Sequence, residues 1–367
     1  MSMTRIIVLA VAFAFFGAGC VAPMFPAKPA STDGGSVQTS SHEAVSVIAS
    51  NLKIPWAIAF LSDGGLLVTE RTGIVQHLAI SATSTTAIPI NGVKHIGEGG
   101  LLGIVLHPDF NTNHWLYLYL TTVQGSHTVN RVDRYVYEKE KFTDRKTIIE
   151  NIPGALYHDG GKLAFGPDGN LYVTTGDAMQ SNLSQDTNSL AGKVLRVKDD
   201  GSIPSDNPFG NAVYSSGHRN SQGLAWDDLG RLWATEHGRS GVLSGFDEIN
   251  LIEKGKNYGW PVIEGDKTQE GMVAPAMNSG PDVTWAPSGL AYVNGSLFVG
   301  GLRGEALYEY VISEKKLITH FKNRFGRIRA VQLGLDGFLY LTTSNTDGRG
   351  TPMEGDDKVI RIDPTFL

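Results

Sequence analysis

His158 and Asp177 are two side chains whose types and spacing suit acid–base chemistry. They flank the two apolar runs of the segment LYHDGGKLAFGPDGNLYVTTGD, residues 156–177, which has the pattern of a β-hairpin with a turn of Gly, Pro, Asp and Asn between its strands. A hairpin brings its ends together, so we expect the histidine to lie beside the carboxylate, as in an oriented general base. The alternative is a capped turn that carries a surface histidine.

The composition is that of a globular protein with enough apolar residues for a large core. Of the 367 residues, 41% are hydrophobic and 19% are charged, and the formal net charge is −6. This acidic balance does not favour nucleic acid as a partner. The 44 glycines and 16 prolines favour many turns and therefore many short strands.

The N-terminal region has the pattern of an export signal. Arg5 supplies a positive charge, residues 6–16 form an apolar stretch too short to span a bilayer comfortably, and residues 17–19 are small. We therefore expect a signal peptide over residues 1–19 and a protein that is periplasmic or extracellular.

Cys20 is the only cysteine, so no intrachain disulfide can form. It follows Gly-Ala-Gly, as the lipidated cysteine of a bacterial lipoprotein does, although Gly17 stands where Leu is usual. Residues 20–42 are rich in Pro, Ala, Ser, Thr and Gly, which suits a flexible tether to a folded domain over residues 43–367. A lipid anchor at Cys20 is then the only membrane contact we expect. The alternative is plain secretion with an incidental cysteine.

One hairpin pattern recurs along the rest of the chain. Six copies begin near residues 56, 101, 162, 223, 289 and 330, at spacings of about 40 to 65 residues. Most are followed by a further strand candidate, at 194–197, 248–251, 307–311 and 359–362. Closure of such an antiparallel repeat protects its sheet edges. We predict an all-β fold, a six-bladed β-propeller of four-stranded antiparallel blades. A β-sandwich would not need six near-copies of one hairpin.

Polar residues concentrate at one end of these hairpins. In a propeller, the positions before each first strand and after each second strand share one mouth. They are occupied here by Glu98, His158, Asp177, Arg219, Asn220, Gly238, Thr284, Arg303, Arg327 and Arg329. Taken singly, each arginine fits a surface salt bridge. Four arginines at equivalent ends favour a polyanionic ligand, because guanidinium groups match carboxylates and phosphates.

Several other kinds of site lack their motifs. There is no P-loop, no dinucleotide fingerprint, no cysteine or histidine cluster with zinc spacing and no G-x-S-x-G. The GEGG at residues 97–100 is too short for a phosphate loop and precedes a strand.

The mouth residues belong to longer segments that resemble a known family. These segments are GEGGLLGIVLHPDF (97–110), HDGGKLAFGPDGNLYVTTGD (158–177), GKVLRVKDDGSIPSDNPF (192–209), GHRNSQGLAW (217–226), DEINLIEKGKNYGWP (247–261) and WAPSGLAYVNGSLFVGGLRG (285–304). They are similar to the glucose/sorbosone dehydrogenase family of soluble aldose sugar dehydrogenases, which use pyrroloquinoline quinone (PQQ) and calcium. The resemblance covers about residues 45–365.

The resemblance implies oxidation of the anomeric carbon of an aldose to a lactone. His158 matches the general base that takes the proton of the anomeric hydroxyl while a hydride passes to PQQ. Asp177 matches the carboxylate that orients this histidine. Arg219 and Asn220 match groups that contact the quinone oxygens and stabilise developing negative charge.

Further cofactor contacts are implied around the mouth. Glu98 stands where family members carry Gln or Glu near the cofactor, and Thr284 matches another contact. Arg303, Arg327 and Arg329 match residues that pair with PQQ carboxylates.

The family also implies two calcium ions. Gly238 and Arg239 occupy the positions whose backbone carbonyls hold the catalytic ion, which polarises the quinone. Glu248 and the Tyr258 carbonyl match ligands of a second, structural ion, to which Asp266 is a candidate addition. The alternative at this second place is a turn stabilised by Glu248 alone.

This sequence departs from the family at the catalytic calcium loop. Arg239 replaces a proline, and the loop between Glu236 and Glu248 is several residues longer than usual. Ser221 also replaces a proline after GHRN. A carbonyl ligand survives such changes only if the backbone path is kept.

Two other functions remain open from the sequence. One is a non-catalytic propeller that binds carbohydrate or a partner, which the altered calcium loop favours. The other is a calcium-dependent hydrolase of the lactonase kind, which would want several carboxylates and Asn at the channel centre rather than arginines. The physiological sugar is not readable, because specificity lies in loops such as 178–190 and 262–281. The electron acceptor is expected to be external.

Overall fold

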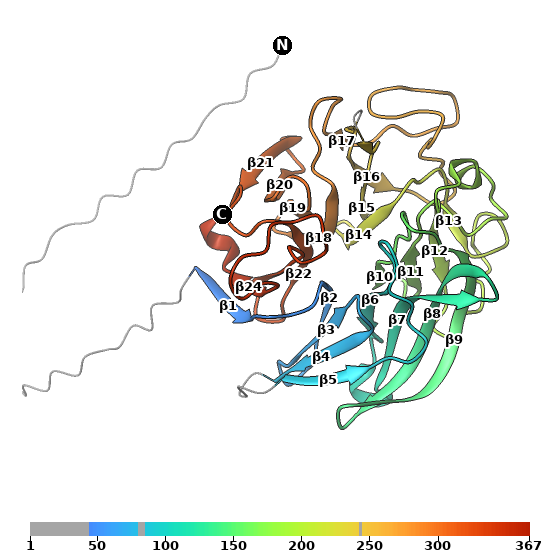
Figure 1. The fold of residues 1–367 in the computed structure, drawn as a ribbon. Coiled ribbons are helices and arrows are strands. Elements are labelled where there is room, and N and C mark those ends of the chain that lie inside the picture. The colour runs from blue at the N-terminus through green and yellow to red at the C-terminus, as the bar shows by residue number, and fades with distance from the viewer. Residues whose placement is uncertain (1–43, 80–84, 242–243) are drawn as a thin grey trace, which may run out of the picture. The chain divides into compact units, whose positions relative to one another are not determined.

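The computed structural model of the protein describes residues 44–79, 85–241 and 244–367, and within them the chain forms six four-stranded antiparallel sheets. The innermost strands gather at the centre of the view and the outermost lie at its periphery (Figure 1). The predicted six-bladed β-propeller is therefore confirmed. The expected signal peptide, tether and lipid anchor at Cys20 lie outside the described residues.

Five blades take their strands in chain order from the centre outward. The first two blades are β2 (Pro55–Phe60), β3 (Leu66–Glu70), β4 (Ile74–Leu78) and β5 (Thr85–Pro89), then β6 (Leu101–Leu106), β7 (Trp115–Gln124), β8 (His127–Glu138) and β9 (Lys141–Pro153). The next three are β10 (Leu163–Phe165), β11 (Leu171–Thr174), β12 (Val194–Val197) and β13 (Val213–Ser215), then β14 (Ser221–Trp226), β15 (Leu232–Glu236), β16 (Glu248–Ile252) and β17 (Met277–Asn278), then β18 (Pro287–Val293), β19 (Ser296–Gly301), β20 (Ala306–Val311) and β21 (Lys316–His320).

The sixth blade joins the two ends of the domain. It contains β22 (Ile328–Leu333), β23 (Leu339–Thr343) and β24 (Val359–Ile362), and its outer strand is β1 (Val45–Ala49) from the start of the domain. The register pairs Val45 with Ile362. This pairing closes the ring, so that the last blade keeps four strands and its outer edge comes from the first described residues.

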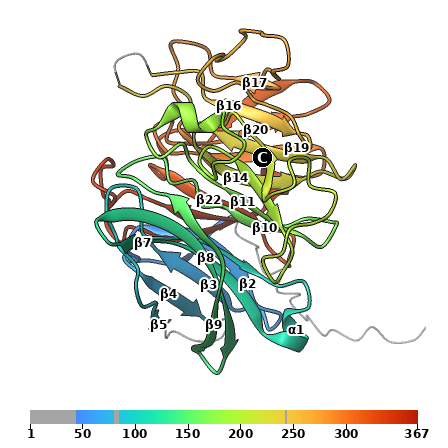
Figure 2. The same cartoon turned by 90° about the vertical axis from the view of Figure 1, so that its right-hand side faces the viewer.

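Helical structure is almost absent from the described residues. The one short α-helix, α1 (Phe110–Asn113), lies within the turn between β6 and β7, and the 3-10 helices are η1 (Ser181–Ser184) and η3 (Pro364–Phe366). No helix among the described residues is long and apolar enough to cross a membrane. The longest strands are β7, β8 and β9, which sweep across the lower part of the side view in Figure 2.

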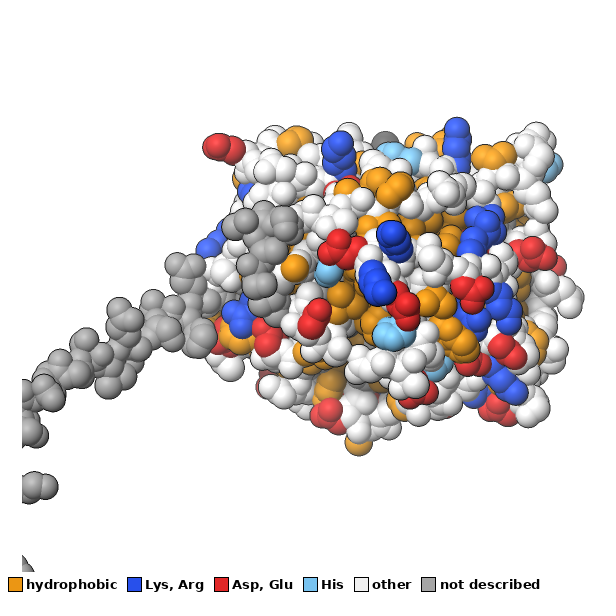
Figure 3. All heavy atoms as spheres, turned by 90° about the horizontal axis from the view of Figure 1, so that it is seen from below, with side chains coloured by type: hydrophobic (Ala, Val, Ile, Leu, Met, Phe, Trp, Pro, Cys, Tyr) orange, Lys and Arg blue, Asp and Glu red, His pale blue; other side chains and the backbone are white. Residues whose placement is uncertain are grey.

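The core lies between neighbouring blades. Leu67 of β3, Leu118 of β7 and Val173 of β11 are fully buried. The second strands β3 and β11 are buried along their whole length, which is why they read as continuous apolar runs rather than alternating ones. On the face shown in Figure 3, acidic and basic side chains are interspersed and neither sign gathers into one patch.

Candidate active site

A cavity of about 600 Å³ opens at the mouth where the predicted site residues meet. Nine of them line it: Glu98, His158, Arg219, Gly238, Arg239, Thr284, Arg303, Arg327 and Arg329. They come from the ends of five different blades, because equivalent hairpin ends share one side of a propeller. Asp177 and Asn220 lie directly behind this wall, and Glu248 and Tyr258 lie in a separate space.

The His158 imidazole and the Asp177 carboxylate form a hydrogen-bonded pair. Nδ1 of His158 lies 2.7 Å from Oδ1 of Asp177. The other carboxylate oxygen accepts a bond of 2.9 Å from Nε1 of Trp260, and the Met179 N–H donates to Oδ1 at 2.8 Å. Burial raises the pKa of Asp177, but these hydrogen bonds outweigh it and hold the pKa below its ordinary value. The pair is therefore an ionised carboxylate that fixes a histidine ring.

The backbone of His158 is held in an unusual conformation. Its φ is +64°, in the left-handed region that few residues other than glycine adopt. The N–H of His158 donates to Oε2 of Glu98 at 3.0 Å. On the other side, Gly176 approaches so closely that an added Cβ would lie 1.9 Å from the His158 carbonyl oxygen. Strain of this kind persists where the surroundings fix it, which is typical of functional sites.

Glu98 links this histidine to a residue that the sequence did not single out. Its Oε1 accepts a bond of 2.6 Å from Nη1 of Arg349, on the loop between β23 and β24. Burial raises the pKa of Glu98, but the His158 N–H and the Arg349 guanidinium lower it to about 2. Glu98 is thus a fixed negative charge that ties the second blade to the sixth.

Three of the cavity's arginines make no ion pair with a carboxylate of the described residues. Arg219 donates to the Ser240 hydroxyl, Arg303 to the Ser244 hydroxyl and Arg329 to the Gln222 amide. Arg219 and Arg329 are only 5% and 6% exposed. Burial lowers the pKa of both, and that of Arg329 to about 9. Arg327, by contrast, is paired with Asp347 at 2.9 Å.

Asn220 is fully buried and carries a donor with no partner. Its Oδ1 accepts from the Gly160 N–H at 3.0 Å, and its backbone carbonyl accepts from the His237 N–H at 3.2 Å. Its Nδ2 has no hydrogen-bond partner among the described residues. An unpaired buried amide costs about 1–3 kcal/mol, so this N–H is a donor that a bound water or ligand would satisfy.

The lengthened loop keeps its backbone fixed at both ends. Asp247 accepts the Gly238 N–H at 2.9 Å and those of Trp285 and Ala286 at 2.6 and 2.8 Å. Arg239 and Gly245 pair as an isolated antiparallel bridge. Gly238 and Arg239 therefore have fixed backbone contacts, and both line the cavity. No group of three His, Cys, Asp or Glu side chains that could hold a metal occurs in the described part of the chain.

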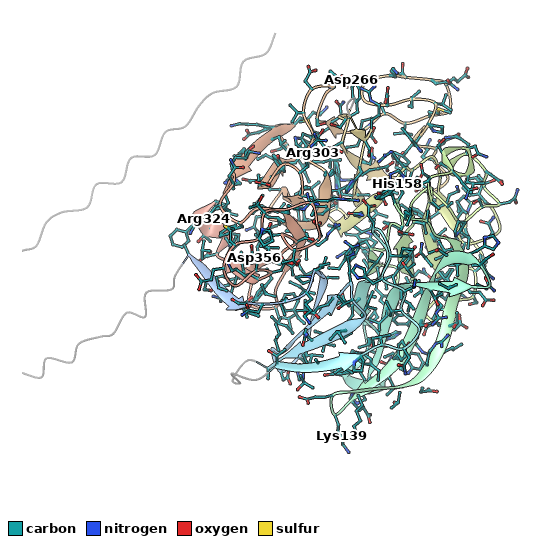
Figure 4. The ribbon with its side chains drawn as sticks, viewed as in Figure 1. Lys139, His158, Asp266, Arg303, Arg324 and Asp356 are labelled. Carbon is teal, nitrogen blue, oxygen red and sulfur yellow. The ribbon has the colours of Figure 1, made fainter. Side chains whose placement is uncertain are left out.

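The residues expected to hold a second calcium lie behind this loop. Glu248 and Tyr258 line a small space of about 10 Å³ together with Arg239 and Glu264. Burial and the neighbouring Glu236 raise the pKa of Glu248. Asp266 does not line this space. It accepts a bond of 2.7 Å from Asn278, and Figure 4 shows it on an outer loop, farther from the central strands than Arg303 and His158.

Sequence reasoning missed two further residues of the site. His237 directly follows β15 and lines the cavity, and the rule that found Asp177 after β11 would have found it. Burial lowers the pKa of His237 to about 3, so the ring is neutral, with Nε2 3.2 Å from the Gln222 amide oxygen. Trp260 had no local signal, since it lies 83 residues from the carboxylate that it contacts.

Comparison with known proteins shows the family to which this chain belongs. The family model described as glucose/sorbosone dehydrogenase matches residues 52–353. The chain belongs to the glucose/sorbosone dehydrogenase family. It is 33% identical to an aldose sugar dehydrogenase of Escherichia coli, over 83% of this chain and 91% of that protein. An uncharacterised protein of Synechocystis is 36% identical, with 85% and 87% of the two chains covered.

A solved structure of this family shares the fold. It is the PQQ-bound aldose sugar dehydrogenase of Streptomyces coelicolor, which is 40% identical and superimposes with a TM-score of 0.80 over 86% of this chain and 97% of that one. The resemblance predicted from the sequence segments is therefore confirmed. The cavity of the present chain combines a histidine that is oriented by a carboxylate with buried arginines. This arrangement suits proton abstraction beside an anionic group.

Proposed function

We propose that the protein is a PQQ-dependent aldose dehydrogenase that oxidises the anomeric carbon of aldoses to lactones. One observation carries the proposal. The His158–Asp177 pair opens onto a cavity where Arg219, Arg303 and Arg329 have no carboxylate partner. Arg303 is exposed, but Arg219 and Arg329 are buried, and buried cations without counter-ions are costly unless a ligand supplies the negative charge.

The residues at the cavity fit PQQ. The cofactor carries three carboxylates, and three arginines of the cavity have no carboxylate partner in the protein. The unpaired Nδ2 of Asn220 and the guanidinium of Arg219 supply donors for quinone oxygens. A volume of about 600 Å³ lies in the usual range for small-molecule sites. The PQQ-bound relative from Streptomyces supports this assignment.

His158 is the proposed general base. With its Nδ1–H donated to Asp177, the lone pair of Nε2 is available in the cavity. It would take the proton of the sugar's anomeric hydroxyl, and Asp177 would stabilise the imidazolium that results. Bound PQQ would supply the hydride acceptor. The electrons then pass to an external acceptor.

Calcium is proposed at the carbonyls of Gly238 and Arg239. The support is the backbone itself, since the Gly238 N–H donates to Asp247 and the Arg239 N–H donates to the Gly245 carbonyl at 2.9 Å. A hard cation held by carbonyl oxygens would act as a Lewis acid. A second ion at Glu248 and Tyr258 remains a proposal, as do export and the lipid anchor at Cys20.

The deciding experiment is a titration of the purified chain with PQQ, followed by absorbance, with Ca²⁺ and with a chelator. We expect saturable binding that Ca²⁺ strengthens, and dye reduction by the loaded protein with glucose and other aldoses. Sugar binding without any PQQ absorbance change would favour the non-catalytic propeller instead. Lactone hydrolysis without dye reduction would favour the hydrolase.

A further inference from the structure

A second cavity lies at the other end of the six central strands. It holds about 530 Å³ and is lined mainly by apolar side chains. Each central strand contributes to its wall, with Ile58, Val105, Ala164, Leu224, Leu290 and Leu333 as one example from each blade. We call this space the far-end cavity. Its size is that of a small-molecule site.

The floor of the far-end cavity carries a cation. Lys162 lines the cavity, and its Nζ donates to Oε1 of Gln332 at 3.3 Å. No carboxylate of the described residues forms an ion pair with it. Burial alone lowers the pKa of Lys162 to about 8, so that the amine is still mostly charged near neutral pH. The walls offer little else that is polar to satisfy it.

This floor separates the far-end cavity from the arginine-lined cavity. Between the two lies a space of only about 10 Å³, bordered by Lys162 and Gln332 on one side and by Arg329 and Gln222 on the other. Two cation–amide pairs therefore close the channel. A ligand in the far-end cavity meets Lys162 and goes no deeper.

The chemistry of this cavity selects its ligand. A partly buried ammonium without a counter-ion favours an anion, because a carboxylate accepts a charge-assisted hydrogen bond from it. Apolar walls favour a hydrocarbon body, at roughly 25 cal/mol for each Å² buried. We propose that the far-end cavity binds a small amphiphilic anion, with its carboxylate at Lys162 and its apolar body along the central strands. Sugars and polyanions lack partners there.

The test is a calorimetric titration of the full chain with dodecanoate below its micelle concentration, compared with dodecanol. We expect one saturable site per chain and binding of dodecanol at least 10-fold weaker. Lys162→Met keeps an unbranched side chain that is one atom shorter and removes its charge. It should weaken dodecanoate binding at least 10-fold and abolish the difference between the two ligands.

Two variants at exposed leucines test whether the ligand binds in the far-end cavity. Leu335 is 74% exposed and lines the far-end cavity, whereas Leu229 is 76% exposed in the corresponding turn of the fourth blade and does not line it. Leu335→Glu should repel the anion and weaken binding, and Leu229→Glu should not. Because Leu335 is exposed, its variant tests the site even if Lys162→Met fails to fold.

Three results would overturn the proposal. They are the absence of saturable binding to the wild type, equal effects of the two leucine variants, and displacement of dodecanoate by citrate. The last result would put the anion in the arginine-lined cavity. The titration uses the protein both without and with PQQ, so its outcome is independent of the proposed dehydrogenase activity.

Discussion

The Asp177 carboxylate lies 2.7 Å from Nδ1 of His158 and is itself fixed by the indole N–H of Trp260. This order of contacts separates two roles. The histidine faces the cavity, whereas the carboxylate is only 2% exposed and does not line it. In the proposed mechanism Asp177 therefore acts through the histidine, by holding its Nδ1–H and leaving Nε2 free.

Asp177→Asn should lower kcat for aldose oxidation by on the order of 10²–10⁴, the usual contribution of a positioned base. An amide stabilises the imidazolium less and permits the wrong tautomer. PQQ affinity should stay close to wild type, because both Asp177 oxygens are already occupied by hydrogen bonds from the protein. Dye-reduction kinetics and a PQQ titration measure the two effects. The exposed Asp186→Asn is the control, and a D177N variant with wild-type kcat would contradict the assignment.

Trp260→Phe should shift the pH profile without removing the pair. The ring remains, but the bond to Asp177 is lost, and that bond is one of those that lower the Asp177 pKa. The pKa of Asp177 should then rise, and a carboxylate without the indole donor attracts a proton onto His158 more strongly, so that activity is lost at a higher pH on the acid side than in the wild type. The measurement is kcat against pH for both proteins. An acid limb that stays in place would show that the indole N–H does not influence the pair.

Glu98→Gln should remove acid-sensitive stability from the cofactor-free protein. The pKa of Glu98 is about 2, below its ordinary value of 4.5, so its contribution is present above 4.5 and disappears as pH falls towards 2. The ceiling is about 3 kcal/mol, at about 1.4 kcal/mol per pKa unit. The melting temperature of the variant should therefore be lower than that of the wild type, with the largest difference at pH 7 and a progressively smaller one towards pH 3.

The exposed Glu314→Gln controls for the loss of one charge. A gap in melting temperature between Glu98→Gln and the wild type that is the same at every pH would argue against the paired, ionised state of Glu98. The amide oxygen introduced by Glu98→Gln would still accept the His158 N–H, so the comparison reports mainly on charge and on the contact with Arg349.

Asn220→Asp tests the unpaired donor directly. The substitution keeps the oxygen that accepts the Gly160 N–H but replaces the free Nδ2 with a second oxygen. PQQ affinity should fall by on the order of 10- to 100-fold, about 1.4 to 3 kcal/mol, because a donor becomes a repelling acceptor. The absorbance titration measures this. Unchanged affinity would mean that the Asn220 amide does not face the cofactor.

The fold and about half of the residues that line the cavity could be predicted from the sequence, because the signals that specify them are local. Each hairpin carries its own turn signal, and the hairpin geometry alone brings His158 to Asp177. The residues that were missed depend on long-range packing. Trp260 and Arg349 approach from other blades, and β1 closes the sixth blade from the opposite end of the domain. No local pattern encodes such contacts.

The lengthened loop between Glu236 and Glu248 shows a different limit of sequence reasoning. Its altered residues raised doubt about the backbone path at Gly238 and Arg239. The structure keeps both residues at the cavity, because Asp247 binds three N–H groups at once. The sequence does not reveal that Asp247 is buried and accepts hydrogen bonds from backbone groups far along the chain, because no local pattern distinguishes it from any other Asp.

Gly238→Ala tests whether that loop holds the proposed calcium. A Cβ at this position would lie 2.2 Å from the carbonyl oxygens of both Gly245 and Phe246, so the backbone must shift. Ca²⁺-dependent strengthening of PQQ binding should be lost, while melting of the cofactor-free protein changes less. Gly230→Asn, in an open left-handed turn of the same blade, is the control and should bind like the wild type. If Gly238→Ala retains the full effect of Ca²⁺, the carbonyls at 238 and 239 are not its ligands.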